Sequence, residues 1–162
     1  MSLTNTFEEL HHKYQPMVIQ LCLGFVKGEM DMAKDLSQDI FINVWNALGR
    51  FESKSSYKTW IYRISINTCL LHIRNAKKTI SVSLDKVNLA EENSNETDQN
   101  FATLYQAIGK LNEVDRLIIM LVLDELSYDE IAEIMGINPT NLRVKIHRIK
   151  KKLKELLQDE RA

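Results

Sequence analysis

Residues 127–157, SYDEIAEIMGINPTNLRVKIHRIKKKLKELL, decide the fold of the C-terminal part of this 162-residue chain. Ser127 and Glu130 have the spacing of a capping box, which satisfies free backbone N–H groups where a helix begins. Gly136 supplies a left-handed residue that ends the helix, and the following Asn-Pro pair is suited to cap and begin a second one. Two helices joined by a tight glycine turn predict a helix-turn-helix.

The second predicted helix has an apolar face and a cationic face. Its apolar stripe, which has helical spacing and is expected to be buried, consists of Leu142, Ile146, Ile149, Leu153 and Leu156. Seven Lys and Arg residues occur within residues 143–154, before the first acid at Glu155. A solvated face that complements the helix dipole is one explanation of these cations. Contact with nucleic-acid phosphates explains the excess more directly.

The net charge of −1 conceals four blocks of alternating sign. Residues 1–53 carry −3, residues 54–84 carry +6, residues 85–142 carry −9 and residues 143–162 carry +5. A general polyanion binder would be basic throughout its length. The alternation therefore favours two separate nucleic-acid contacts on a chain that otherwise avoids loose attachment.

Helical periodicity continues through the N-terminal half and predicts an all-α protein. A first helix over 7–26 is expected to kink or restart near Gln15 because Pro16 follows, and a second runs from Glu29 or Asp31 to Gly49. A third helix begins after Ser55 or Ser56. Its expected inward residues are Trp60, Ile61, Ile64, Thr68 and Leu71.

Aromatic residues interleave with cations along this third helix, and no acid occurs between Glu52 and Asp85. Stacking faces beside a positive groove suit unpaired bases as well as duplex phosphates. Simple core packing is the competing interpretation of the aromatic residues. It is the favoured one for Trp60 and the less favoured one for Tyr62.

Residues 79–100 are polar, acidic and free of aromatic residues, which predicts a flexible linker. About 20 residues extend to about 70 Å, or about two turns of B-DNA. We therefore expect two small helical domains, residues 1–78 and residues 101–162. The second should be a four-helix unit that contains the helix-turn-helix.

Several function classes find no support in the sequence. No apolar run approaches the roughly 18 residues of a membrane span, and the N-terminus lacks the basic start of a signal peptide, so a cytoplasmic protein is expected. Cys22 and Cys69 stand outside any CxxC or Cys/His cluster and are expected to be buried small hydrophobes. No catalytic grouping, metal cluster or glycine-rich phosphate loop is present, so neither an enzyme nor a cofactor is expected.

The chain resembles the extracytoplasmic-function (ECF) sigma factors of bacterial RNA polymerase over nearly its whole length. Residues 33–51, AKDLSQDIFINVWNALGRF, are similar to that family's core-polymerase-binding helix. Residues 55–74, SSYKTWIYRISINTCLLHIR, are similar to its promoter-melting segment, and residues 111–153 to its C-terminal domain. The resemblance implies transcription initiation at promoters, with core polymerase, duplex and melted promoter DNA and an anti-sigma factor as partners.

Three surfaces follow from the resemblance. The polymerase surface would consist of Asp35, Gln38, Asp39, Phe41 and Trp45. The minus-ten surface would consist of Arg50, Tyr57, Lys58, Tyr62, Arg63, Asn67 and Arg74. The minus-thirty-five surface would consist of Thr140, Asn141, Arg143, Val144, Lys145, His147, Arg148 and Lys150.

Three positions of the helix-turn-helix depart from the family pattern, in which residue 144 is often serine, residue 140 small and residue 139 valine. Val144 could contact a thymine methyl group but cannot donate a hydrogen bond to a base edge. The promoter preference is therefore expected to differ.

Two other functions compete with the sigma-factor interpretation. An ordinary helix-turn-helix regulator, whose N-terminal helices sense a ligand or dimerise, would bind palindromic duplex DNA without polymerase. It leaves the acid-free basic block 54–78 unexplained. A protein-binding adaptor would show no DNA dependence in either basic block.

Overall fold

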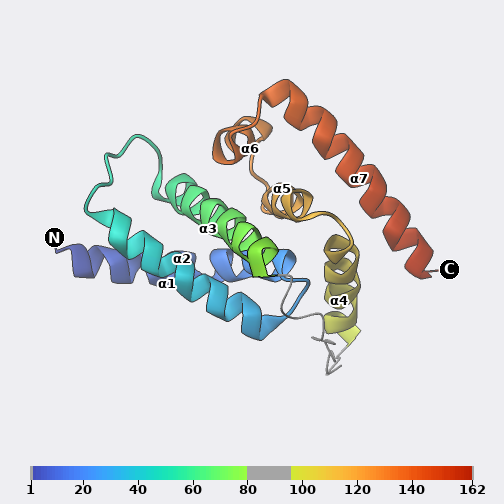
Figure 1. Cartoon of the computed structure of the whole chain (residues 1–162), viewed down its shortest axis with the longest axis horizontal. Coiled ribbons are helices and arrows are strands. Elements are labelled where there is room, and N and C mark those ends of the chain that lie inside the picture. Colours follow the sequence, from blue (N-terminus) through green and yellow to red (C-terminus); the bar gives the residue numbers. More distant parts are fainter. Residues whose placement is uncertain (1, 80–95, 162) are drawn as a thin grey trace.

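The computed structural model describes residues 2–79 and 96–161, and within these ranges it contains α-helices and no strand (Figure 1). The N-terminal unit consists of α1 (Leu3–Phe25), α2 (Met30–Leu48) and α3 (Tyr57–Thr79). The C-terminal unit consists of α4 (Glu96–Gly109), α5 (Glu113–Leu123), α6 (Tyr128–Met135) and α7 (Pro139–Arg161). The predicted all-α fold is confirmed. No helix in the described ranges is long and apolar enough to cross a membrane.

The predicted linker falls mostly on residues outside the described ranges. Its last part differs from the expectation, because residues 96–100 already belong to α4. The acidic composition of this stretch predicted a linker. Further along α4, however, apolar residues pack the helix into the core, and two of them, Ala107 and Ile108, are fully buried.

The helix-turn-helix forms with the predicted caps. Ser127 Oγ accepts a hydrogen bond from the backbone N–H of Glu130 at 3.1 Å, and α6 begins at the next residue. Gly136 ends α6 in the left-handed conformation, with φ of 67°. Asn138 Oδ1 accepts from the backbone N–H of Thr140 at 2.9 Å, with Pro139 as the first residue of α7.

The expected restart of the first helix is wrong, because α1 continues through Pro16. Proline removes one backbone donor and disturbs the carbonyl four residues earlier. Pro16 and His12 both lie on the exposed side of α1, where water is available to hydrate that carbonyl. The first helix also begins at Leu3, four residues before the predicted start. The bounds of α2 and the start of α3 follow the prediction: Glu29 precedes α2, Gly49 follows it, and Ser56 Oγ accepts from Thr59 N–H at the start of α3.

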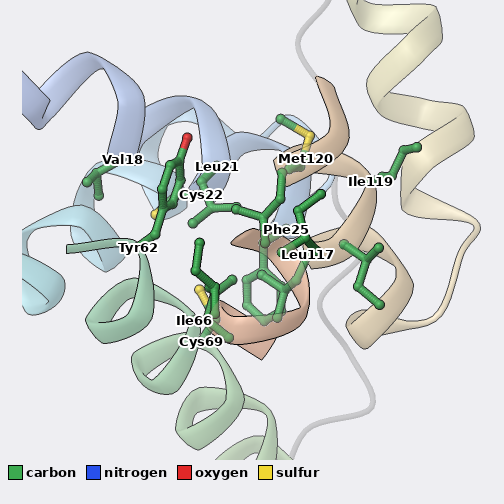
Figure 2. Packing of buried hydrophobic residues seen from close by; sticks show 14 of the residues in the cluster. Val18, Leu21, Cys22, Phe25, Tyr62, Ile66, Cys69, Leu117, Ile119 and Met120 are labelled. Atoms are coloured by element: carbon green, nitrogen blue, oxygen red, sulfur yellow. The ribbon is translucent and has the colours of Figure 1, made fainter. Parts of the chain in front are cut away.

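The two units share one hydrophobic core. In Figure 2 the labelled side chains of α1, α3 and α5 meet in a single cluster, which includes Phe25 from α1, Ile66 from α3 and Leu117 from α5. Cys22 and Cys69 lie in this cluster, fully buried and not joined in a disulfide, as predicted. The two units therefore pack directly against each other (Figure 1).

The buried face of α3 is rotated from the predicted one. Leu71 was expected to point inward, but half of it is exposed (51%). The buried side chains of α3 are Ile61, Tyr62, Ser65, Ile66 and Cys69. The reason is that α3 packs against α1 and α2 on one side and against α5 and α6 of the other unit on another.

Candidate polymerase and nucleic-acid interfaces

The outer face of α7 presents most of the predicted minus-thirty-five surface to solvent. Its apolar stripe faces inward, from Leu142, which is fully buried, to Leu153, while α7 forms an outer edge of the molecule (Figure 1). The exposed members of the surface are Thr140, Asn141, Arg143, Val144, His147, Arg148 and Lys150. These side chains lie on the solvent-exposed face of α7.

Two cations of α7 have partners inside the C-terminal unit. Lys145 is half-buried, with its Nζ 3.7 Å from the buried Oδ1 of Asp115. Lys150 Nζ donates to the hydroxyl of Tyr128 at 3.2 Å and lies 5.8 Å from the centre of that ring. Arg143 and Arg148 are exposed, which makes them the stronger candidates for contacts with bases and phosphates.

The structure separates the predicted minus-ten surface into two parts. Arg50, Asn67 and Arg74 are exposed to solvent. Tyr57 is half-buried and stacks on Phe51, with ring centres 4.4 Å apart. This first part is accessible to solvent.

The second part of the minus-ten surface faces the C-terminal unit. Lys58 Nζ lies 3.6 Å from Asp124 Oδ2, and the Tyr62 hydroxyl donates a short hydrogen bond to the same carboxylate. Arg63 Nη2 donates to Glu133 Oε1 at 2.9 Å. We call these three contacts the interdomain latch.

On α3, Trp60 was expected to be more buried than Tyr62, but the structure shows the reverse. Tyr62 is buried (2% exposed), whereas Trp60 is only half-buried. Burial raises the pKa of Tyr62, and its hydrogen bond to Asp124 raises that pKa further. In this conformation Tyr62 is not available to stack on a base.

The predicted polymerase surface on α2 combines exposed polar residues with an aromatic groove. Asp35, Gln38, Asp39 and Trp45 are exposed, and Trp45 retains 45% of its accessible area. Phe41, which helical spacing assigns to the apolar stripe of α2, is buried (4% exposed), so it cannot itself form the outward surface that the resemblance implies. It instead forms part of the lining of the groove.

That groove has a volume of about 390 Å³ and lies between α1 and α2. Its lining residues are Phe7, His11, Gln38, Phe41, Ile42 and Trp45. The Phe7 ring meets the Trp45 ring edge-on at 5.3 Å, and the His11 ring packs on Phe41 at 4.6 Å. The sequence analysis did not assign Phe7, His11 or Ile42 to this site, although the four-residue spacing of Phe7 and His11 places them on one helix face.

No group of three or more metal-ligating side chains occurs in the described part of the chain. The three surfaces are built from cations, amides, carboxylates and aromatic rings.

Two protein-family models match this chain. Residues 10–79 match the family model described as Sigma-70 region 2, and residues 101–153 match the model described as Sigma-70, region 4. The chain is 31% identical to the RNA polymerase sigma-H factor of Pseudomonas aeruginosa, over 94% of this chain and 86% of that protein. It is 29% identical to the ECF RNA polymerase sigma factor SigW of Bacillus subtilis, over 96% and 90% respectively.

A solved structure with the same fold is the sigma factor RpoE of Bartonella quintana, in complex with the anti-sigma factor NepR. It superimposes with a TM-score of 0.76 over 94% of this chain and 97% of that chain, at 22% identity. The two sigma-70 regions occur in this chain in the order of the predicted motifs, and full-length relatives align along almost its whole length. The chain belongs to the ECF family of RNA polymerase sigma factors.

Proposed function

We propose that this ECF sigma factor binds core RNA polymerase through α2, captures the minus-ten element through α3 and contacts the minus-thirty-five element through α7. The observation that carries the proposal is the separation of chemistry along one chain. An acidic and aromatic surface on α2 accompanies cationic faces on α3 and α7, which belong to different units. An ordinary helix-turn-helix regulator has no need of the first two surfaces.

On α2, Trp45 is the proposed anchor for polymerase. Its ring is exposed but held by Phe7, which reduces the conformational entropy that it loses on binding. The carboxylates of Asp35 and Asp39 are exposed on the same helix and would complement a basic coiled coil of the largest polymerase subunit.

On α3, the proposed role is capture of a flipped base from the non-template strand. Arg63 and Asn67 supply hydrogen-bonding groups, and the Phe51–Tyr57 stack supplies aromatic faces. Trapping of unpaired bases would provide the free energy of promoter opening. We therefore propose a non-enzymatic role without nucleotide hydrolysis by this chain.

On α7, Arg143, Val144, His147 and Arg148 are the proposed major-groove residues. Their exposure on one helix, whose opposite face is buried, fits the way that a recognition helix lies in the groove. We also propose that the protein acts in the cytoplasm and is regulated by an anti-sigma factor, as RpoE of Bartonella quintana is found bound to NepR.

Reconstituted transcription with core polymerase on a library of promoters tests the proposal. The wild-type protein should direct initiation from a subset of promoters. Trp45→Ala should lose association with core polymerase, whereas Met32→Ala should retain it, because Met32 is equally exposed on the same helix (46%) but lies outside the aromatic groove. Binding to palindromic duplex DNA without any polymerase dependence would instead support the rival regulator.

A further inference from the structure

Asp115 lies in the first turn of α5 with one carboxylate oxygen buried. The side chain is 18% exposed, and its Oδ1 atom accepts no hydrogen bond from the described residues. The Nζ atom of Lys145, on α7, lies 3.7 Å from Asp115 Oδ1. A buried carboxylate oxygen without a donor is costly, and a nearby ammonium group offsets part of that cost. The ion pair therefore holds the Lys145 ammonium group against α5, which packs against α7.

Lys145 borders the solvent-exposed face of α7. Residues three and four apart are neighbours on a helix surface. Asn141 and Arg148 stand at these distances from Lys145, and both are exposed. The Lys145 side chain is itself 41% exposed, and a lysine stem is long and flexible. Its ammonium group is thus within reach of a phosphate beside this face, but the structure places it at Asp115.

Lys150 also has a partner in the C-terminal unit, but that partner carries a different charge. Lys150 donates to the hydroxyl of Tyr128, which is a neutral group, and the lysine side chain remains exposed. A neutral hydroxyl leaves the positive charge of Lys150 available to DNA. The carboxylate of Asp115, in contrast, cancels much of the charge of Lys145 at close range.

We propose that Asp115 is a positioning residue that withholds Lys145 from DNA, so that α7 makes one phosphate contact fewer than its cations allow. The inference rests on the proposed function of α7. It removes Lys145 from the phosphate contacts of the predicted minus-thirty-five surface. Phosphate contacts carry no sequence information directly. Asp115 therefore weakens binding to duplex DNA of every sequence and leaves the base preference to the exposed residues of α7.

The first experiment neutralises Asp115 with little change of shape. Binding of the full chain to a fluorescent duplex of random sequence is measured at several salt concentrations. If Asp115→Asn frees Lys145 to contact one phosphate, the slope of log affinity against log salt concentration should steepen by about 0.9, and affinity at physiological salt should rise about five-fold. The matched control is Asp129→Asn, which removes an exposed carboxylate from the first turn of α6. It should keep the wild-type slope.

The second experiment tests whether the gain comes from Lys145. Lys145→Gln alone should keep the wild-type slope, because Lys145 contacts no phosphate while Asp115 holds it. The double variant Asp115→Asn/Lys145→Gln should lose the gain of Asp115→Asn and return to the wild-type slope. This non-additivity would show that Asp115 acts through Lys145. A merely structural role of the ion pair would change the thermal stability and leave the slope unaltered.

Three results would each overturn the withholding of Lys145: a wild-type slope in Asp115→Asn, a steeper slope that persists in the double variant, or a flatter slope in Lys145→Gln alone. If Asp115→Asn does not fold, as judged by circular dichroism, the slope of Lys145→Gln decides by itself. Arg148→Gln separates this inference from the proposed function. A flatter slope in Arg148→Gln retains α7 as a DNA surface, and an unchanged slope and affinity reject it.

Discussion

At the residue scale, single side chains of α7 are proposed to read sequence. Arg143 is exposed near the start of that helix, and no ion pair to it occurs among the described residues. If its guanidinium binds the O6 and N7 atoms of guanine, Arg143→Ala should cost about 1–3 kcal/mol of binding free energy and relax the base preference at one position. Affinity measurements on duplexes with each base at every position of the minus-thirty-five element check this.

An equal loss of affinity on every duplex would contradict base recognition by Arg143 and assign it to phosphate alone. Lys154→Ala is the matched control, because Lys154 is exposed on the same helix more than two turns beyond Arg143. It should leave the base preference unchanged.

The two cysteines allow a second prediction at this scale. Hydrogen bonding to Cys22, with burial as a further cause, raises the pKa of the Cys69 thiol well above its ordinary value. A raised pKa leaves less of the reactive thiolate at a given pH. At pH 8 the folded protein should therefore react with an aromatic disulfide reagent far more slowly than the protein unfolded in urea. Equal reaction rates in the two states would contradict the buried arrangement.

At the element scale, sequence patterns predicted the helices well where the partners were local. The capping box at Ser127, the glycine at 136 and the apolar stripe of α7 are fixed by neighbours in the chain, and the structure has them as predicted. The inward face of α3 was predicted less well. Its apolar residues nearly surround the helix, and the choice among them depends on α5 and α6, which are distant in sequence.

The same distinction between local and distant partners explains how well the burial of the site residues was predicted. Exposure of Asp35, Asp39 and Arg143 followed from helical periodicity within one element. The burial of Phe41 also follows from helical spacing, which assigns it to the apolar stripe of α2. The burial of Tyr62 depends on the other unit, so it could not be predicted from α3 alone.

A prediction for α7 concerns its cations beyond the recognition residues. Lys151 is exposed, and contact with one phosphate would release about one condensed counterion on duplex binding. Lys151→Gln should therefore reduce the slope of log affinity against log salt concentration by about 0.9, with no change of base preference. Lys13→Gln, an equal change of charge on α1, should leave the slope unaltered. An unchanged slope for Lys151→Gln would show that this side chain does not contact phosphate.

At the scale of the whole molecule, the shared core couples two units that the sequence separates by an acidic stretch. The charge blocks indicated two nucleic-acid contacts. In the structure, however, acids of the C-terminal unit lie next to cations of α3. Composition could not reveal which acids meet which cations. The two units also meet where Gly24 lies close to Met120 and where Arg116 donates to the carbonyl of Phe25, and neither contact has a periodic signature in the sequence.

Coupling of the units makes a prediction about unfolding. Both tryptophans, Trp45 and Trp60, lie in the N-terminal unit, so their fluorescence reports on that unit, while far-ultraviolet circular dichroism reports on all helices. In the wild type the two urea transitions should coincide, because one core unfolds cooperatively.

Arg116→Met should separate these two transitions. The substitution leaves the carbonyl groups of Phe25 and Leu111 without the donors that Arg116 supplies, at a cost of about 1–3 kcal/mol, and it removes the hydrogen bond from α5 to Phe25 at the end of α1. Lys152→Met, which removes an exposed cation on α7, should keep a single transition. Coincident transitions in Arg116→Met would show that apolar packing between the units suffices to couple them without the hydrogen bond of Arg116 to Phe25.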